Sequence, residues 1–102
     1  MQLTTGSRWR SAVCDTQVIV VKAPAQEVLL ECGGHPMLPL DQEPPEGATI
    51  DAAFASGTAI GKRFAHPDTE LELLATKGGE GTLAVDGAPI PLKDAKPLPS
   101  SD

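Results

Sequence analysis

Short apolar runs interrupted by turn residues constrain this chain more than any other feature. Four of them, at 17–22, 27–32, 70–76 and 82–85, are β-branched or alternate between apolar and polar positions, and glycine or proline soon follows each. Branched side chains fit a pleated strand better than a helix, and a period of two marks a half-buried strand. The pattern predicts an all-β domain, a small antiparallel β-barrel or sandwich of about six short strands with at most one short helix.

Two hairpins are predicted at the ends of this pattern. Residues 7–14 and 17–22 form the first, with a turn at Asp15-Thr16. Asp86-Gly87 is the strongest hairpin signal, because both residues tolerate the positive φ of a type I′ turn. The returning run 88–92 contains two prolines and therefore reads as an edge strand, through which a homo-oligomer could form.

Two further segments are expected to join the domain. Residues 58–64 read as a strand with Ile60 and Phe64 pointing inward, and 48–55 as a short helix or an irregular strand. The length of 102 residues fits one domain. We place that domain at 1–92 and predict a flexible Pro/Ser tail at 93–102.

The charge of the chain excludes two classes of partner. The sequence has 14 acidic and 8 basic residues, a formal net charge of -6. Nucleic-acid binding relies on Lys and Arg that neutralise phosphates, and anionic membrane surfaces attract the same cations. We therefore expect neither nucleic acid nor membrane as a partner. No signal-peptide profile opens the chain, which predicts a cytoplasmic protein.

Two cysteines and a histidine are the candidates for chemistry. Cys32 and His35 flank a glycine turn, and Cys14 lies at the end of another predicted strand. Zinc takes thiolate and imidazole ligands, so Cys14, Cys32 and His35 form a candidate metal site. A reactive Cys32 thiolate activated by His35 is a second interpretation. The alternative is that both cysteines are small core residues and no cofactor is needed.

A proline-rich loop supplies the candidate binding surface. Residues 33–47 carry the candidate contact residues His35, Met37, Leu38 and Leu40 on a backbone stiffened by proline, and such segments lose little entropy on docking. Trp9, between two arginines, is a second candidate anchor. Since no recognisable catalytic spacing is present, we expect a non-catalytic binding or accessory module for a protein partner or small ligand. The alternative is a metal-binding or thiol-dependent protein that uses Cys14, Cys32 and His35.

Overall fold

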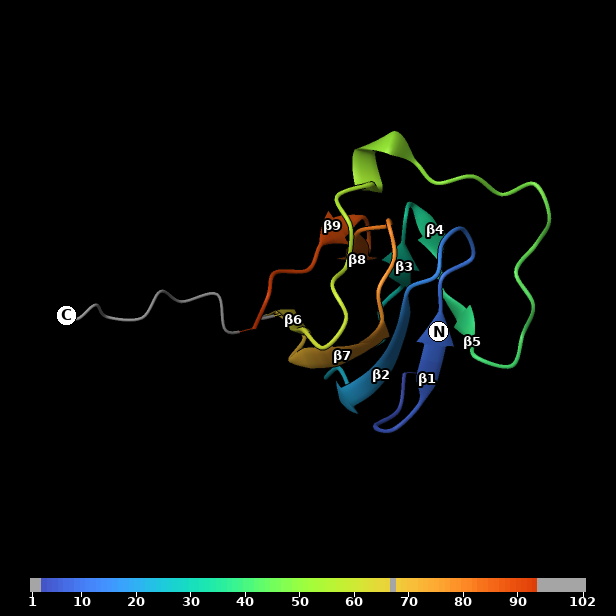
Figure 1. The fold of residues 1–102 in the computed structure, drawn as a ribbon. Coiled ribbons are helices and arrows are strands. Elements are labelled where there is room, and N and C mark those ends of the chain that lie inside the picture. The colour runs from blue at the N-terminus through green and yellow to red at the C-terminus, as the bar shows by residue number, and fades with distance from the viewer. Residues whose placement is uncertain (1–2, 67, 94–102) are drawn as a thin grey trace.

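The computed structural model describes residues 3–66 and 68–93, which fold into two antiparallel β-sheets (Figure 1). The five-stranded sheet has the order β5-β1-β2-β7-β6 and the four-stranded sheet the order β4-β3-β8-β9. The strands are β1 (Arg8–Arg10), β2 (Gln17–Lys22), β3 (Leu30–Cys32), β4 (His35–Pro36), β5 (Leu38–Pro39), β6 (Arg63–His66), β7 (Leu71–Lys77), β8 (Leu83–Val85) and β9 (Ala88–Pro89). The all-β prediction is confirmed. Within the described residues the strands do not close into a barrel.

The two longest strands lie side by side within the five-stranded sheet and bury one face. In β2, Val18 and Val20 are each 1% exposed, and in β7 Leu71 and Leu73 are fully buried. Their neighbours in sequence are only half-buried or exposed, as a period of two requires. The strand predicted at 17–22 and the inward face of 70–76 are therefore confirmed, although only one face of the first strand is buried.

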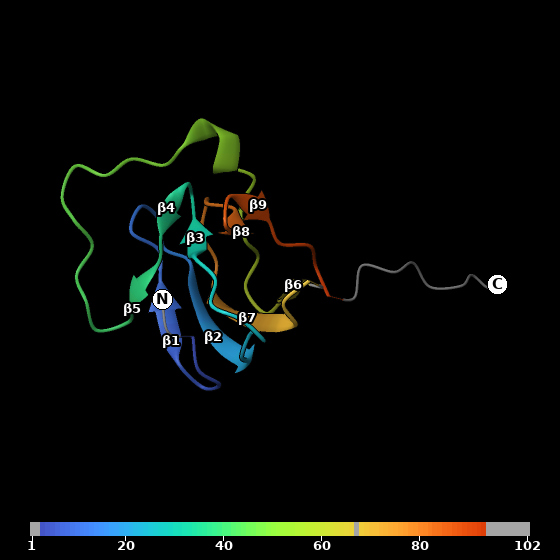
Figure 2. The ribbon, with the colours of Figure 1, turned by 180° about the vertical axis from the view of Figure 1, so that it is seen from behind.

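The shortest of the connections between the two sheets is one residue long. Strands β4 and β5 are consecutive in the chain, separated by Met37, yet they belong to different sheets (Figure 2). The backbone nitrogen of Met37 donates to Leu30 O, and its side chain is 2% exposed in the core. Met37 therefore packs in the hydrophobic core that the two sheets share, with residues such as Leu30 and Val85 of the smaller sheet.

The edges of both sheets are protected against pairing with another chain. Strands β4, β5 and β9 each end on a proline, which has no N–H to donate to a neighbouring strand. The remaining edge strand, β6, is covered by the segment that follows β9. Ala65 N donates to Pro91 O, and Lys93 N donates to Arg63 O. These features disfavour the edge-to-edge association that the sequence allowed.

One sequence prediction about the middle of the chain is corrected, and a short helix expected there is present. Ile60 is 65% exposed and does not point into the core, because the strand β6 starts only at Arg63. Phe64 is buried as expected. The stretch 48–55 holds one turn of 3₁₀ helix, Ala52–Phe54, whose first turn is capped by the side chain of Asp51.

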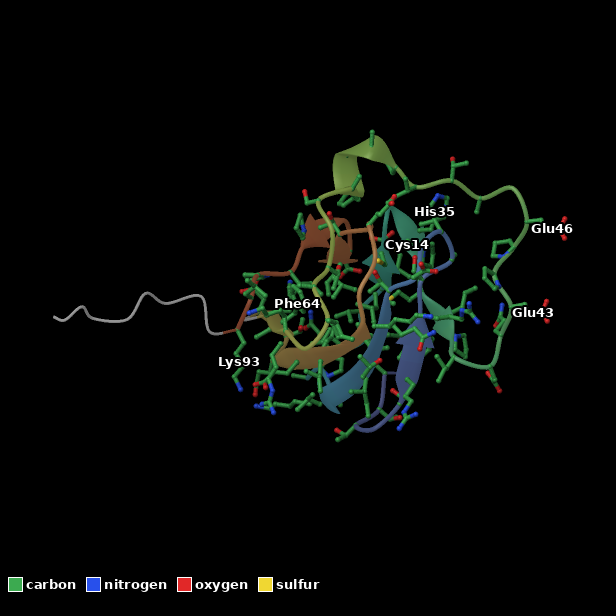
Figure 3. The ribbon with its side chains drawn as sticks, viewed as in Figure 1. Cys14, His35, Glu43, Glu46, Phe64 and Lys93 are labelled. Carbon is green, nitrogen blue, oxygen red and sulfur yellow. The ribbon has the colours of Figure 1, made fainter. Side chains whose placement is uncertain are left out.

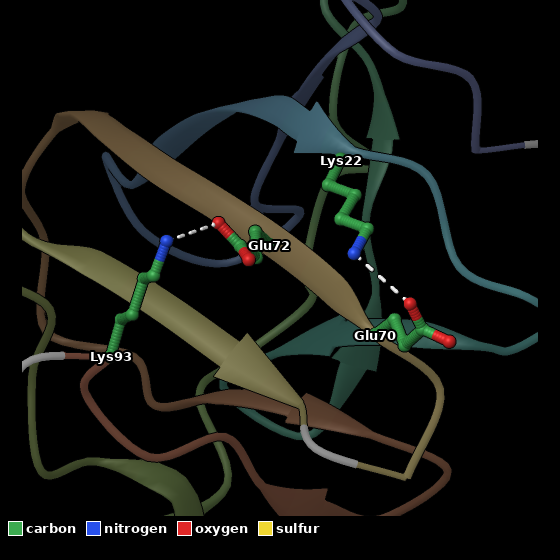
Figure 4. Close-up of polar contacts among 4 residues, drawn as sticks. All are labelled: Lys22, Glu70, Glu72 and Lys93. Carbon is green, nitrogen blue, oxygen red and sulfur yellow. Dashed lines mark hydrogen bonds and ion pairs between the residues drawn. The ribbon is translucent and has the colours of Figure 1, made fainter.

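Two ion pairs cross the outer surface of the larger sheet (Figure 4). Lys22 Nζ lies 3.0 Å from Glu70 Oε1, and Lys93 Nζ lies 2.8 Å from Glu72 Oε1. The hydrogen bond from Lys93 lowers the pKa of Glu72, but exposed pairs of this kind stabilise a fold only slightly. Lys93 thus packs with the domain, and the rest of the predicted tail lies outside the described residues. None of the described helices has the length and apolar character needed to cross a membrane.

Candidate functional site: a cysteine pair between the two sheets

The two cysteines of the chain meet where the larger sheet adjoins the smaller one. Cys14 follows β1 of the larger sheet, and Cys32 is the last residue of β3 in the smaller sheet. Their Sγ atoms lie 3.8 Å apart, and both are free thiols. Cys32 is completely buried, whereas Cys14 is half-buried. Cys14 is labelled in Figure 3. The pair is therefore asymmetric: one sulfur has access to solvent and the other does not.

A hydrogen-bonded loop holds Cys14 in place. It runs from Ser11 to Thr16, and the backbone N–H of Ser11 donates to Thr16 O at 2.9 Å to close it. The buried Ser11 Oγ accepts the N–H groups of Val13 and Cys14, each at 3.1 Å. A hydroxyl oxygen that accepts two hydrogen bonds still has its own proton to donate. Ser11 thus orients the loop and keeps a donor for a nearby sulfur.

Two glycines of the β7–β8 connection pack directly on the thiols. A Cβ atom at Gly81 would lie 2.8 Å from Cys32 Sγ and 3.1 Å from Cys14 Sγ. A Cβ atom at Gly79 would lie 3.0 Å from Cys14 Sγ and would overlap Thr16. The absence of a side chain at Gly81 also lets its N–H donate to Cys14 Sγ at 3.4 Å. The site requires glycine at both positions because the backbone itself forms its wall.

Hydrogen bonds lower the pKa of Cys14. Partial burial acts to raise the pKa of this thiol, but hydrogen bonds from Ser11 and Thr16 outweigh the burial and bring the pKa below its ordinary value of 9.0. The sulfur lies 3.3 Å from Thr16 Oγ1. The thiol donates to this hydroxyl, and the hydroxyl donates back once the sulfur is a thiolate. Cys14 is therefore the more readily ionised member of the pair.

The pKa of Cys32 shifts in the opposite direction to that of Cys14, because Cys32 is fully buried. Desolvation, together with the negative charge of a Cys14 thiolate, raises the pKa of Cys32 to about 12. Cys32 consequently stays protonated while Cys14 ionises. The thiolate is the reactive form of cysteine, so the two sulfurs have different chemical roles.

A surface hollow leads to Cys14. Its volume is about 290 Å³, and it is lined by Val13, Cys14, Asp15, Gly79 and Glu80. A second hollow of about 310 Å³, lined by Gly61, Lys62, Arg63 and Leu92, is formed by other residues and includes neither thiol. The first hollow is therefore the one that Cys14 lines.

The predicted metal site is not assembled as a set of three ligands. His35 pairs with Cys32 in the β3–β4 register. Its ring Nε2, however, donates to Thr49 O at 2.8 Å, on the long loop 40–51 between β5 and the 3₁₀ helix. Across residues 3–66 and 68–93, no three side chains of His, Cys, Asp or Glu come together in a group that could hold a metal ion. The structure therefore brings Cys14 and Cys32 together and leaves His35 outside.

The predicted binding loop divides into a packed and an exposed part. Met37 lies in the core, so it cannot contribute to a docking surface, and Leu38 and Leu40 are half-buried. Residues 41–47 are exposed, and Glu43 and Glu46 project from the outer edge of the loop (Figure 3). Trp9 packs against the core, and its indole N–H donates to Ser7 Oγ at 3.0 Å. Met37 and Leu40 therefore do not form the exposed apolar patch that the binding interpretation required.

Sequence analysis missed four residues that shape the thiol site: Ser11, Thr16, Gly79 and Gly81. Serine, threonine and glycine are common in turns, so their presence alone carries no chemical signal. The one local clue is the spacing of Ser11, three residues before Cys14, which allows a side-chain oxygen to accept from the following backbone amides.

Selective alkylation of Cys14 is the first expected result. Iodoacetamide attacks thiolates, and a lowered pKa moves the rate profile of Cys14 toward lower pH. We expect modification of the folded protein at Cys14 alone, with a midpoint below pH 9.0, measured by peptide mass spectrometry. The Cys14→Ser variant should show almost no labelling until it is unfolded. Equal labelling of both cysteines in the native protein would contradict the assigned asymmetry.

Comparisons of this chain with protein-family models, with curated proteins and with solved structures found no match.

Proposed function

We propose that this protein is a thiol-dependent redox protein in which Cys14 and Cys32 interconvert between two thiols and one disulfide. The observation that carries the proposal is the 3.8 Å separation of two sulfurs in unequal surroundings. A disulfide needs its sulfurs about 2.0 Å apart, so the two must approach each other by a further 1.8 Å or so. Side-chain rotation of Cys14, on its loop, is the movement that we expect to supply this approach.

The unequal pKa values suit a two-step exchange. The Cys14 thiolate attacks one sulfur of an external disulfide, forms a mixed disulfide and releases a thiolate. Cys32 then attacks the Cys14 sulfur and releases the second external thiol. The charge of the Cys14 thiolate contributes to the raised pKa of Cys32, so forming the mixed disulfide removes that contribution. The first step therefore prepares the second.

The disulfide would tie two parts of the fold together. It would close a loop between positions 18 residues apart and link the Ser11–Thr16 loop to the end of β3. A cross-link over a loop of this length stabilises a protein by about 3 kcal/mol. Oxidation is thus expected to raise the melting temperature, and reduction to lower it again.

The thiol interpretation is supported over the two alternatives by the surroundings of the sulfurs. Hydroxyl groups and a backbone N–H contact Cys14 as hydrogen-bond partners. Within the described residues, no imidazole or carboxylate completes a set of three metal ligands with the two thiols. The loop form of the binding-module interpretation needed Met37 and Leu40 exposed as one patch, and Met37 is buried. The alternative of a thiol-dependent protein, without His35, agrees best with the geometry.

Oxidation with bis(2-hydroxyethyl) disulfide tests the proposal. We expect the intact protein to lose two hydrogen atoms and yield one Cys14–Cys32 peptide by mass spectrometry, without a covalent dimer. In the Cys32→Ser variant the second step is blocked, so Cys14 should retain the hydroxyethylthio group as a stable adduct.

The matched variant is Cys14→Ser, which leaves Cys32 buried and unreactive. It should gain no adduct under the same conditions. A native protein that accumulates adducts on either cysteine, and never forms the internal disulfide, would rule out the proposed function.

A further inference from the structure

The hollow that Cys14 lines is also lined by two acidic residues. Asp15 and Glu80 both line it, and both are exposed. The described lining contains no lysine, arginine or histidine. A reagent that reaches Cys14 Sγ therefore passes two carboxylates with no positive side chain of the lining to offset them.

The size of the hollow limits what can enter it. Its volume of about 290 Å³ is just below the smallest usual ligand pockets, which start at roughly 300 Å³. The attacked sulfur must come within contact distance of Cys14 Sγ, so the groups attached to that sulfur lie inside the hollow beside Asp15 and Glu80. Charges on those groups then interact with both carboxylates, and the interaction is strongest when the charges are close.

We propose that the exchange partner of Cys14 is a low-molecular-weight disulfide or thiol that carries positive charge next to its sulfur. This inference rests on the proposed function and specifies its substrate class. The first step forms a Cys14–S–S–R bond and breaks the S–S bond of R–S–S–R, which releases RS⁻. The second forms the Cys14–Cys32 bond and releases a second RS⁻, while the two cysteine protons pass to the two thiolates. Two electrons leave the cysteines and reduce one R–S–S–R to two R–SH.

Three small disulfides of similar size but different charge test this inference. Cystamine is a dication, bis(2-hydroxyethyl) disulfide is neutral, and 3,3′-dithiodipropionate is a dianion. The rate of the first step is measured for each on the Cys32→Ser protein by mass spectrometry of the quenched adduct. We expect cystamine to react about tenfold faster than the dianion, with the neutral disulfide between them. Added salt should narrow this ratio, because ions screen exposed charges.

Two double variants with the same change in net charge decide whether the effect is local. Asp15→Asn with Glu80→Gln removes the carboxylates of the hollow, and Glu43→Gln with Glu46→Gln removes two from the long loop. The ratio of cystamine to dianion rates cancels any change in the ionised fraction of Cys14. We expect the ratio to fall toward one in the first variant and to remain unchanged in the second.

Each other outcome has a distinct meaning. Equal rates for the three reagents, with the internal disulfide still forming in the native protein, would overturn the inference and leave the proposed function standing. An equal fall of the ratio in both double variants would assign the selectivity to the overall charge and also overturn the inference. If the native protein forms no internal disulfide with any reagent, the proposed function fails and this inference fails with it.

Discussion

Replacing Leu73 with alanine is expected to cost about 2–5 kcal/mol of unfolding free energy, the largest effect of any single change considered for this chain. Leu73 is fully buried in β7, which is hydrogen-bonded to β2 on one side and to β6 on the other. The smaller side chain leaves a cavity that the surrounding strands can fill only in part. Because a domain of this size has only about 5–15 kcal/mol of stability, the variant should unfold at much lower denaturant concentration.

Two further variants make this result interpretable. Ile60→Ala removes a comparable side chain at a position that is 65% exposed, and it should change stability by less than about 0.5 kcal/mol. Leu73→Met nearly conserves volume and should cost less than about 1.5 kcal/mol, which gives a measurable protein if Leu73→Ala does not fold. Urea unfolding followed by circular dichroism measures all three. Equal stability of Leu73→Ala and Ile60→Ala would contradict the assigned core.

Gly81→Ala is expected both to destabilise the fold and to impair the thiol site. The new Cβ atom would lie 2.8 Å from Cys32 Sγ and 2.9 Å from the backbone nitrogen of Gly33, closer than real Cβ contacts allow. The sulfur can rotate away, but the backbone at Gly33 belongs to the β3–β4 turn and cannot yield as easily. Overpacking of this kind costs about 1–3 kcal/mol, or some 4–8 °C in melting temperature for each kcal/mol.

The control for this variant is Gly47→Ala. Gly47 has a positive φ of 82°, but a Cβ atom there would meet nothing within 4 Å. Backbone strain alone should cost about 1–2 kcal/mol and leave the thiols untouched. The readouts are the melting temperature and the rate at which the internal disulfide forms. We expect only Gly81→Ala to slow disulfide formation, and equal rates in both variants would contradict the close packing of Gly81 on the sulfurs.

The regular strands of this fold were predictable from sequence because alternate residues of a strand face the core and the solvent in turn. The alternation in 70–76 correctly placed Leu71 and Leu73 in the core. The Asp86-Gly87 turn was also identified, and both residues have positive φ, 50° and 84°. In these segments, the position of a residue within its strand or turn is enough to predict where its side chain points.

The irregular segments were not predictable in the same way. Met37 lies between two prolines, and its burial depends on β4 and β5 joining different sheets, which no local pattern encodes. Ile60 precedes the strand that was expected to contain it, so it is exposed. Both errors arise where tertiary arrangement, rather than periodicity, decides which side chain is buried.

The thiol site was predictable only in part. Cys14 and Cys32 stood out by residue type, and their positions at the ends of strands suggested that they could meet. Their separate roles could not be derived, because the pKa of each sulfur depends on contacts made by residues far apart in sequence. Gly81, for example, donates to Cys14 from 67 positions away.

A redox titration of the Cys14–Cys32 pair tests the central claim most directly. The native protein is equilibrated with 2-mercaptoethanol and its disulfide in varied proportions, quenched with acid, and the fraction of internal disulfide is measured by mass spectrometry. If the pair is a reversible redox couple, this fraction follows one two-electron curve, and samples that start oxidised and reduced reach the same values. If the thiols stay reduced at every proportion, or oxidise to products that 2-mercaptoethanol does not reverse, the account is contradicted.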